Sequence, residues 1–197
     1  MIFPAPPPEA PSFSLKPYQK VGIIDIETPM SFYPKDGIRE VSCIVFQNWE
    51  IIDQVTFGDI IDSEMYQKGY GQGLAPIEQD EGYKRSFRDF LEKHDHPPLI
   101  AHNADFDRSF LYMWNWIEEA YPFYCSVRGL RKLQLDTPNH KLSTLMNHFG
   151  ISNPQKHQAL EDCLALFYIL SAAGHIAAVR CKSISSKVKQ RKNELSS

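Results

Sequence analysis

Residues 22–30 read GIIDIETPM, and this short run decides how the rest of the chain is interpreted. Apolar residues dominate its first half, as in a buried strand, yet the run also contains Asp25 and Glu27. Side chains alternate between the two faces of a strand, so these two acids share one face. Adjacent carboxylates repel each other and are costly to bury, and no basic residue lies beside them on the strand. A divalent cation would relieve the repulsion, although many strands end in an acid and bind no metal.

The elements expected around this strand describe one α/β domain. Residues 40–57 alternate between apolar and polar side chains, which predicts two antiparallel strands with a turn at residues 48–50. Asn103 is an expected N-cap, and Gly150 is an expected end of a helix. Helices are expected over 77–94, 103–120, 140–150 and 157–179, and short strands over 97–102 and 123–127. This order predicts a mixed five-stranded sheet, an antiparallel hairpin joined to parallel strands, flanked by helices.

Composition favours a globular protein with a tail at each end. A chain of 197 residues that is 43% hydrophobic can bury one sizeable core, so a single domain is expected over residues 18–178. Residues 1–17 form a Pro-rich tail, and residues 179–197 form a basic one. The net charge of −3 argues mildly against a nucleic-acid binder, but residues 180–192 carry six basic residues and no acidic ones.

The same composition predicts a location and excludes a membrane protein. No apolar run approaches the roughly 20 residues that a membrane span needs, and the N-terminus lacks the pattern of a secretory signal. The four cysteines show no paired spacing, so reduced thiols are expected rather than disulfides or a zinc site. We therefore expect a cytoplasmic protein with no membrane partner.

A second group of acids follows the next predicted buried strand. Residues 99–110 read LIAHNADFDRSF, which places Asp105 and Asp107 in the first turn of a helix. Acids in that turn interact favourably with the helix dipole, and this alone accounts for them. Ligand sites, however, also cluster at strand ends in α/β sheets. Helical spacing puts Asp107 on the face of Phe110 and Leu111, toward the sheet, and directs Asp105 outward.

The last predicted helix carries a third acid in apolar surroundings. Asp162 lies in HQALEDCLAL, residues 157–166, among alanine, leucine and cysteine. On a regular helix His157 would lie about 140° away from Asp162. The two share a site only if His157 belongs to the loop or first turn before the helix, and Pro154 just upstream makes that arrangement plausible.

Together, DIET, HNADFD and HQALED, with KLSTL ahead of the last, resemble the DnaQ-like (DEDDh) family of 3′→5′ exonucleases, which have a ribonuclease H-like fold. The resemblance covers about residues 20–175, and the histidine before the last aspartate indicates the DEDDh branch. It implies two divalent cations, Mg²⁺ or Mn²⁺, with a histidine as general base. The residues it assigns to the metals are Asp25, Glu27, Asp107 and Asp162, and the base is His157.

The resemblance further implies a function and a substrate. The chain would hydrolyse phosphodiester bonds at the 3′ end of DNA or RNA by a two-metal mechanism and release nucleoside monophosphates. Its partner would be a nucleic acid with a free 3′ end, single-stranded or frayed. Proofreading, DNA repair and RNA trimming all remain open. The expected substrate contacts are Thr28, Phe32, Tyr33, His102, Asn103 and Phe106.

Two departures and several alternatives accompany this interpretation. Pro29 and Met30 stand where the family often has Thr-Gly, which leaves the conformation of that loop open, and Cys125-Ser126 replaces a common Asp-Thr pair. A non-catalytic nucleic-acid-binding or partner module with an impaired site is the first alternative, and an endonuclease of the ribonuclease H type is the second. A homodimer, and docking of a partner through either tail, also stay open.

Overall fold

The computed structural model describes the chain in six stretches. They are residues 19–28, 37–58, 76–152, 158–174, 176–181 and 184–196. Several sequence predictions fall outside them. These are the Pro-rich segment 1–17, the Pro29-Met30 pair, the expected contacts Phe32 and Tyr33, and the expected base His157.

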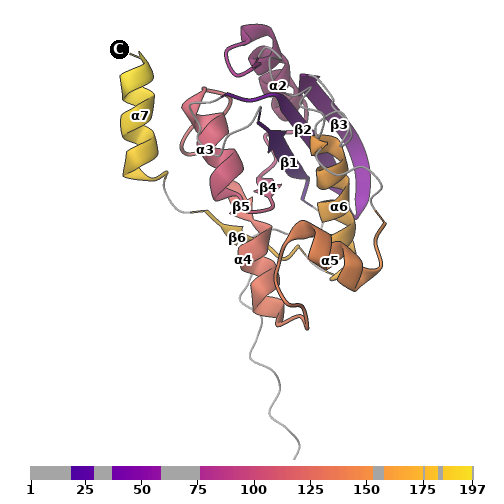
Figure 1. The fold of residues 1–197 in the computed structure, drawn as a ribbon. Coiled ribbons are helices and arrows are strands. Elements are labelled where there is room, and N and C mark those ends of the chain that lie inside the picture. Colours follow the sequence, from indigo (N-terminus) through magenta and orange to yellow (C-terminus); the bar gives the residue numbers. More distant parts are fainter. Residues whose placement is uncertain are drawn as a thin grey trace, which may run out of the picture.

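A mixed sheet runs through the centre of the molecule (Figure 1). Its order is β3-β2-β1-β4-β5-β6, with β1 antiparallel to β2 and parallel to β4. β5 is parallel to β4 and antiparallel to β6. The strands are β1 (Val21–Glu27), β2 (Glu40–Gln47), β3 (Glu50–Gly58), β4 (Leu99–Ala101), β5 (Phe123–Cys125) and β6 (Val179–Arg180).

The antiparallel hairpin forms where its alternating pattern predicted it. β2 and β3 are joined at Asn48 and Trp49, both with positive φ, and Gln47 pairs with Glu50 across the turn. Such a two-residue turn matches the twist of the strands it joins. The expected mixed arrangement is therefore confirmed, with one more strand than the five predicted: β6, only two residues long, adds to the edge of β5.

Helices cover both faces of the sheet (Figure 1). On one face, α5 and α6 pack on the side of β1 that carries Val21 and Ile23. On the other, α2 and α3 pack on the side that carries Ile24 and Ile26. The helices, including one 3₁₀ helix η2, are α2 (Glu81–Lys93), α3 (Asp105–Met113), α4 (Ser126–Leu130), η2 (Arg131–Leu133), α5 (Leu142–Phe149), α6 (Ala159–Ala172) and α7 (Ser186–Ser196).

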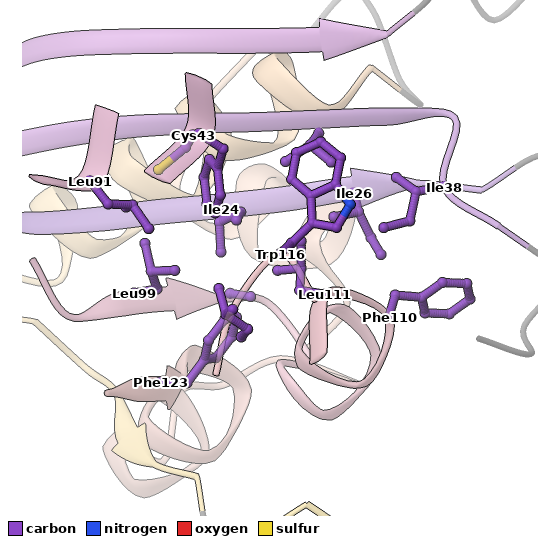
Figure 2. Close-up of a cluster of buried hydrophobic side chains, with 14 of the residues drawn as sticks. Ile24, Ile26, Ile38, Cys43, Leu91, Leu99, Phe110, Leu111, Trp116 and Phe123 are labelled. Carbon is purple, nitrogen blue, oxygen red and sulfur yellow. The ribbon is translucent and has the colours of Figure 1, made fainter. Parts of the chain in front are cut away.

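Figure 2 shows the apolar cluster between β1 and the α2–α3 layer, in which Trp116 lies against Ile26 and Leu111. The Trp116 side chain is 1% exposed, and its indole N–H donates to the carbonyl oxygen of Glu78. A buried tryptophan contributes a large apolar area only if its N–H finds a partner, and this contact supplies one. The cluster thus fixes α3, which carries two of the acids, against β1.

Helix ends agree with the sequence at some positions and not at others. Gly150, with φ 67°, ends α5 as predicted. Asn103 does not cap α3: the residue before the helix is Ala104, no side chain caps it, and Asn103 itself has φ 64° in the preceding turn. Helix α6 ends at Ala172, before the expected residue 179, because the chain then turns to form β6.

The segment expected as a basic tail contains ordered elements. After β6, helix α7 packs beside α3, where Lys189 pairs with Glu119 at 2.5 Å. The Lys192 ammonium lies 3.9 Å from the centre of the Tyr112 ring and donates to the Tyr112 carbonyl. All four cysteines are buried free thiols. Within the described stretches no helix is both long and apolar enough to cross a membrane.

Candidate metal centre

The candidate site begins at the carboxyl end of β1. Asp25 and Glu27 lie on the same side of the strand as Ile23, which packs under α6. Carboxylate oxygens of Asp25, Glu27 and Asp162 all lie within 4.8 Å of one another. The predicted pairing of Asp25 with Glu27, and of both with Asp162 from a distant helix, is therefore present in the fold.

Asp107 reaches the same strand from α3. β4 pairs with β1 only at Gly22 and Ile23, so the Ile26 N–H near the end of β1 has no strand partner on that side. The Asp107 carboxylate accepts from this N–H at 3.3 Å, and Asp107 is 2% exposed. Asp105 points to the surface instead and pairs with Arg128. Helical spacing thus predicted the orientation of both residues.

Asp162 is placed by the first turn of α6. Its backbone N–H donates to the Gln158 carbonyl at 3.1 Å. Gln158 provides no side-chain cap for the helix. Instead, the Ala159 N–H donates to Oε1 of Glu40, on β2, at 3.1 Å. A carboxylate at a helix N-terminus satisfies an unpaired N–H and stabilises the helix dipole, so Glu40 holds α6 at the turn that carries Asp162.

The acids are crowded enough to shift their ionisation. Burial, reinforced by the negative charges of Glu27 and Asp162, raises the pKa of Asp107 to about 8. Burial also raises the pKa of Glu27 to about 7 and that of Asp162 to about 6. The pKa of Asp25 is raised well above its usual value by burial and by the surrounding carboxylates, Asp107 foremost. In the absence of a cation, protons reduce the negative charge of this cluster.

Two further charged residues adjoin the acids, and the sequence did not predict them. Arg39, 1% exposed, lies 3.7 Å from the Glu27 carboxylate and 3.6 Å from that of Glu40. Its positive charge opposes the rise in pKa that burial imposes on Glu27. β1 itself carries no basic residue beside the acids, and Arg39 comes from the segment leading into β2. Strand register, which pairs Glu27 with Glu40, brings it there.

The expected substrate contacts within the described stretches differ in how available they are. Asn103 is exposed at the turn before α3, and Thr28 is half-buried just after β1. Phe106 is half-buried with its ring 4.8 Å from that of Phe110. His102 is already engaged: Nε2 lies 2.8 Å from the His140 carbonyl oxygen, and Nδ1 lies 3.0 Å from the Ser126 hydroxyl. Burial lowers the pKa of His102 to about 4, so its ring is neutral.

The donor set suits a hard divalent cation. All the ligand atoms are carboxylate oxygens, which Mg²⁺ and Mn²⁺ prefer, and those of Asp25, Glu27 and Asp162 converge from one strand and one helix. Asp107, on α3, adjoins them through its contact with the Ile26 N–H. The raised pKa values show that the folded protein holds these charges together at a cost. A cation would replace the protons and compensate that repulsion, so the residues present fit a metal centre.

Comparisons with known proteins give distant relatives and a fold. No protein-family model matches the chain. The chain is 31% identical over 157 residues to a DNA polymerase III of the PolC type from Listeria innocua. It is 27% identical over 165 residues to the PolC-type polymerase of Lacticaseibacillus paracasei. These matches cover 75% and 79% of this chain but 11% of each polymerase, so the chain spans about a tenth of the length of these relatives.

Two similar solved structures are of one exonuclease. A zinc-bound complex of Escherichia coli exonuclease I with single-stranded DNA matches with a TM-score of 0.60 and 14% identity. A complex of the same enzyme with a dA16 oligonucleotide matches with a TM-score of 0.57 and 14% identity. Each match covers 79% of this chain and 40% of the exonuclease chain. The expected α/β class with a ribonuclease H-like fold is thereby confirmed.

Proposed function

We propose that this chain is a metal-dependent nuclease of the DnaQ-like, DEDDh type, which removes nucleotides from the 3′ end of a nucleic acid. The observation that carries the proposal is the convergence of half-buried carboxylates from β1 and α6, with oxygens of Asp25, Glu27 and Asp162 within 4.8 Å of one another. Asp107 joins them through its contact with the backbone of β1. Among the described residues Arg39 is the cation paired with this group, through Glu27 and Glu40, so carboxylates outnumber it.

The proposed metal ligands are Asp25, Glu27, Asp107 and Asp162, which would hold two Mg²⁺ or Mn²⁺ ions. When bound, such a pair stabilises the attacking and leaving oxygens of an in-line displacement at phosphorus. The chain's own contribution is rigid placement. β1 fixes Asp25 and Glu27, the Ile26 N–H orients Asp107, and the Glu40 contact fixes the turn that bears Asp162.

The proposed general base is His157, which directly precedes Gln158 in the sequence. A histidine titrates near neutral pH and accepts a proton from an attacking water efficiently there. The HQALED motif supports this role. His102, which precedes Asp107 in the HNADFD motif, is a poor alternative as the general base. Both of its ring nitrogens are already engaged in contacts within the protein.

The proposed substrate is DNA. Support comes from the similar structures, which are exonuclease I complexes with single-stranded DNA, and from the relatives, which are DNA polymerases. We therefore favour a role in DNA repair or proofreading in the cytoplasm, with a single-stranded or frayed 3′ end bound over Asn103 and Phe106. Trimming of RNA by the same site is the alternative within this proposal, because distinguishing RNA from DNA depends on contacts to the 2′-hydroxyl.

One observation favours a second candidate function, a nucleic-acid-binding module that does not cleave. Arg39 already supplies Glu27 with a buried positive charge, 3.7 Å from its carboxylate. A guanidinium in that position offsets part of the repulsion that a metal would otherwise relieve. In such a module the fold would persist, but neither Mg²⁺ nor Mn²⁺ would support hydrolysis.

The deciding experiment uses four 5′-labelled oligonucleotides, single- and double-stranded DNA and single- and double-stranded RNA. Each is incubated with Mg²⁺, Mn²⁺ or a chelator, with the wild-type chain and with Asp107→Asn. A ladder that shortens from the 3′ end, absent with the chelator and with the variant, is the expected result. The fastest substrate identifies the nucleic acid. Binding without cleavage under either metal would support the non-cleaving module instead.

A further inference from the structure

A cavity of about 530 Å³ lies on the other side of α3 from the acids. One of its walls is α3 itself, through Asp105, Arg108 and Ser109, which recur at the helical spacing of one face. Because each residue advances a helix by about 100°, Asp105 and Asp107 point in nearly opposite directions. The cavity and the acid cluster therefore share a helix but not a face.

The opposite walls come from α4, from β6 and from Ile184 and Ser185 just before α7. Arg128 on α4 and Arg180 on β6 line the cavity together with Ser185. β6 is held by its pairing with β5, and α7 by its contacts with α3. The basic segment expected from sequence to be a tail thus forms one wall of a defined cavity.

The charge of this cavity is positive. Three guanidiniums line it, against the single carboxylate of Asp105, which pairs with Arg128. Arg108 is 6% exposed, and its Nη2 donates to the Glu119 carbonyl at 2.8 Å, so its orientation is fixed by the protein. Arg180 is exposed at the rim. Guanidiniums recognise phosphate oxygens through paired N–H donors, and the hydroxyl of Ser185, which accepts from the Val188 N–H, keeps its own O–H as a further donor of the kind used for phosphate contacts.

We propose that this arginine pocket, lined by Arg108, Arg128 and Arg180, binds a backbone phosphate of the nucleic-acid strand upstream of its 3′ end. The inference rests on the proposed function, because it takes the 3′ end to be held at the acids. A helix with its side chains is about 10–12 Å across, and a duplex strand rises about 3.4 Å per nucleotide. The phosphate bound in the pocket therefore belongs to a nucleotide a few positions upstream of the end.

The test compares Arg180→Gln with Arg131→Gln. Both variants remove one exposed arginine and so change net charge equally, but Arg131, on η2, does not line the cavity. Binding of a labelled 12-nucleotide single strand is measured by fluorescence anisotropy in chelator at several salt concentrations. For Arg180→Gln we expect several-fold weaker binding and a salt dependence, log K against log [salt], that is shallower by about 0.7, the value for one lost phosphate contact on a single strand. Arg131→Gln should match the wild type in both.

A length series gives the second measurement. With Mg²⁺, Arg180→Gln should raise KM for the 12-nucleotide strand without changing kcat. A dinucleotide, too short to reach the pocket, should be cleaved equally by wild type and variant. Equal salt dependence for Arg180→Gln and Arg131→Gln would overturn the inference. So would a KM effect that is the same for the dinucleotide and the longer strand.

Two more outcomes separate this inference from neighbouring ones. Inorganic phosphate or a nucleoside monophosphate could occupy the same guanidiniums. Suppose that either anion binds the wild type at micromolar concentration and binds Arg180→Gln more weakly, while the variant leaves oligonucleotide binding unaffected. The pocket is then a site for small anions, and the proposal that it binds a strand is wrong. Because anisotropy needs no hydrolysis, Arg180-dependent binding without cleavage would support the pocket while overturning the exonuclease. Cleavage from the 3′ end with no dependence on Arg180 would support the exonuclease and overturn the arginine pocket.

Discussion

The two faces of α3 carry surplus charge of opposite sign. Carboxylates are in excess on the inner face, and guanidiniums are in excess on the outer face. On the inner face, Asp107 joins a buried cluster in which carboxylates outnumber positive charges and hold protons to pH values near neutral. On the outer face, Arg108 and Arg128 lie beside one exposed carboxylate, Asp105, in a cavity open to solvent. The sign of the surplus charge is the difference. Crowded carboxylates require a compact cation, whereas the solvent-accessible guanidiniums of Arg128 and Arg180 can exchange a partner for a phosphate strand.

The largest expected effect separates the two aspartates of α3. Asp107→Asn should lower turnover by more than about 1,000-fold, beyond the 10–100-fold typical of losing a residue that only supports a ligand. The fold should persist, because the amide can still accept from the Ile26 N–H. Steady-state cleavage and thermal unfolding together check this. Asp105→Asn is the matched control and should keep most activity. If both variants lose activity equally, the second metal-binding aspartate has been assigned incorrectly.

Removing the buried guanidinium tests how the inner cluster is balanced. Arg39→Met leaves the carboxylates of Glu27 and Glu40 without their shared cation, and breaking one side of a buried pair typically costs about 3–5 kcal/mol. We expect a loss of that size in the free energy of unfolding at pH 8, measured by urea denaturation. The loss should be smaller at pH 5, where protons neutralise the acids. An unchanged stability at both values would mean that Arg39 does not compensate the cluster.

The pH dependence of stability gives a third comparison. The pKa of Asp107 is about 8 in the folded chain against 3.8 for an ordinary aspartate, and that of Glu27 is about 7 against 4.5. Between those values the folded state binds more protons than the unfolded state, so stability falls as pH rises from about 4 to 8.

A metal should reverse that trend. Its ligands must be deprotonated, so Mg²⁺ or Mn²⁺ should stabilise the wild type more at pH 8 than at pH 5. At a concentration of 100 times Kd the gain is about 2.7 kcal/mol. Differential scanning fluorimetry across pH, with metal and with chelator, measures both effects. A metal-free melting temperature that does not fall between pH 5 and 8 would contradict the buried cluster. Absence of any metal effect at millimolar concentration would favour the non-cleaving module.

The smallest expected effect lies on the outer face. Asp105→Asn releases Arg128 from its partner and makes the arginine pocket more positive. Exposed ion pairs contribute about 0.2–1 kcal/mol, so the free energy of unfolding should change by less than 1 kcal/mol. Binding of a 12-nucleotide strand should become slightly tighter at low salt, and the gain should vanish in Arg180→Gln. Weaker binding of Asp105→Asn would indicate that Asp105 orients Arg128 for the phosphate.

Sequence patterns predicted the acids well because parity and helical spacing are local rules. They placed Asp25 and Glu27 on one side of β1 and distinguished Asp107 from Asp105. The roles of Arg39 and Glu40 were not predicted, because they depend on the register between β1 and β2, which no local pattern specifies. β6 was not predicted, because a strand of two residues shows no periodicity in the sequence. The wall that β6 contributes to the arginine pocket was therefore not predicted either. His157, Phe32 and Tyr33 stay predictions, since they lie outside the described residues.

The contact between Glu40 and the Ala159 N–H has a consequence for motion. Helix α6 has no side-chain cap from Gln158, so its first turn is joined to the sheet through one carboxylate of β2. Local unfolding of that turn would carry Asp162 away from Asp25 in the same event. A cation shared by these two acids would then cross-link α6 to β1. Binding of substrate and cation would then slow the local unfolding of the first turn of α6. Slow hydrogen exchange of the Ala159 amide would indicate that the site is assembled.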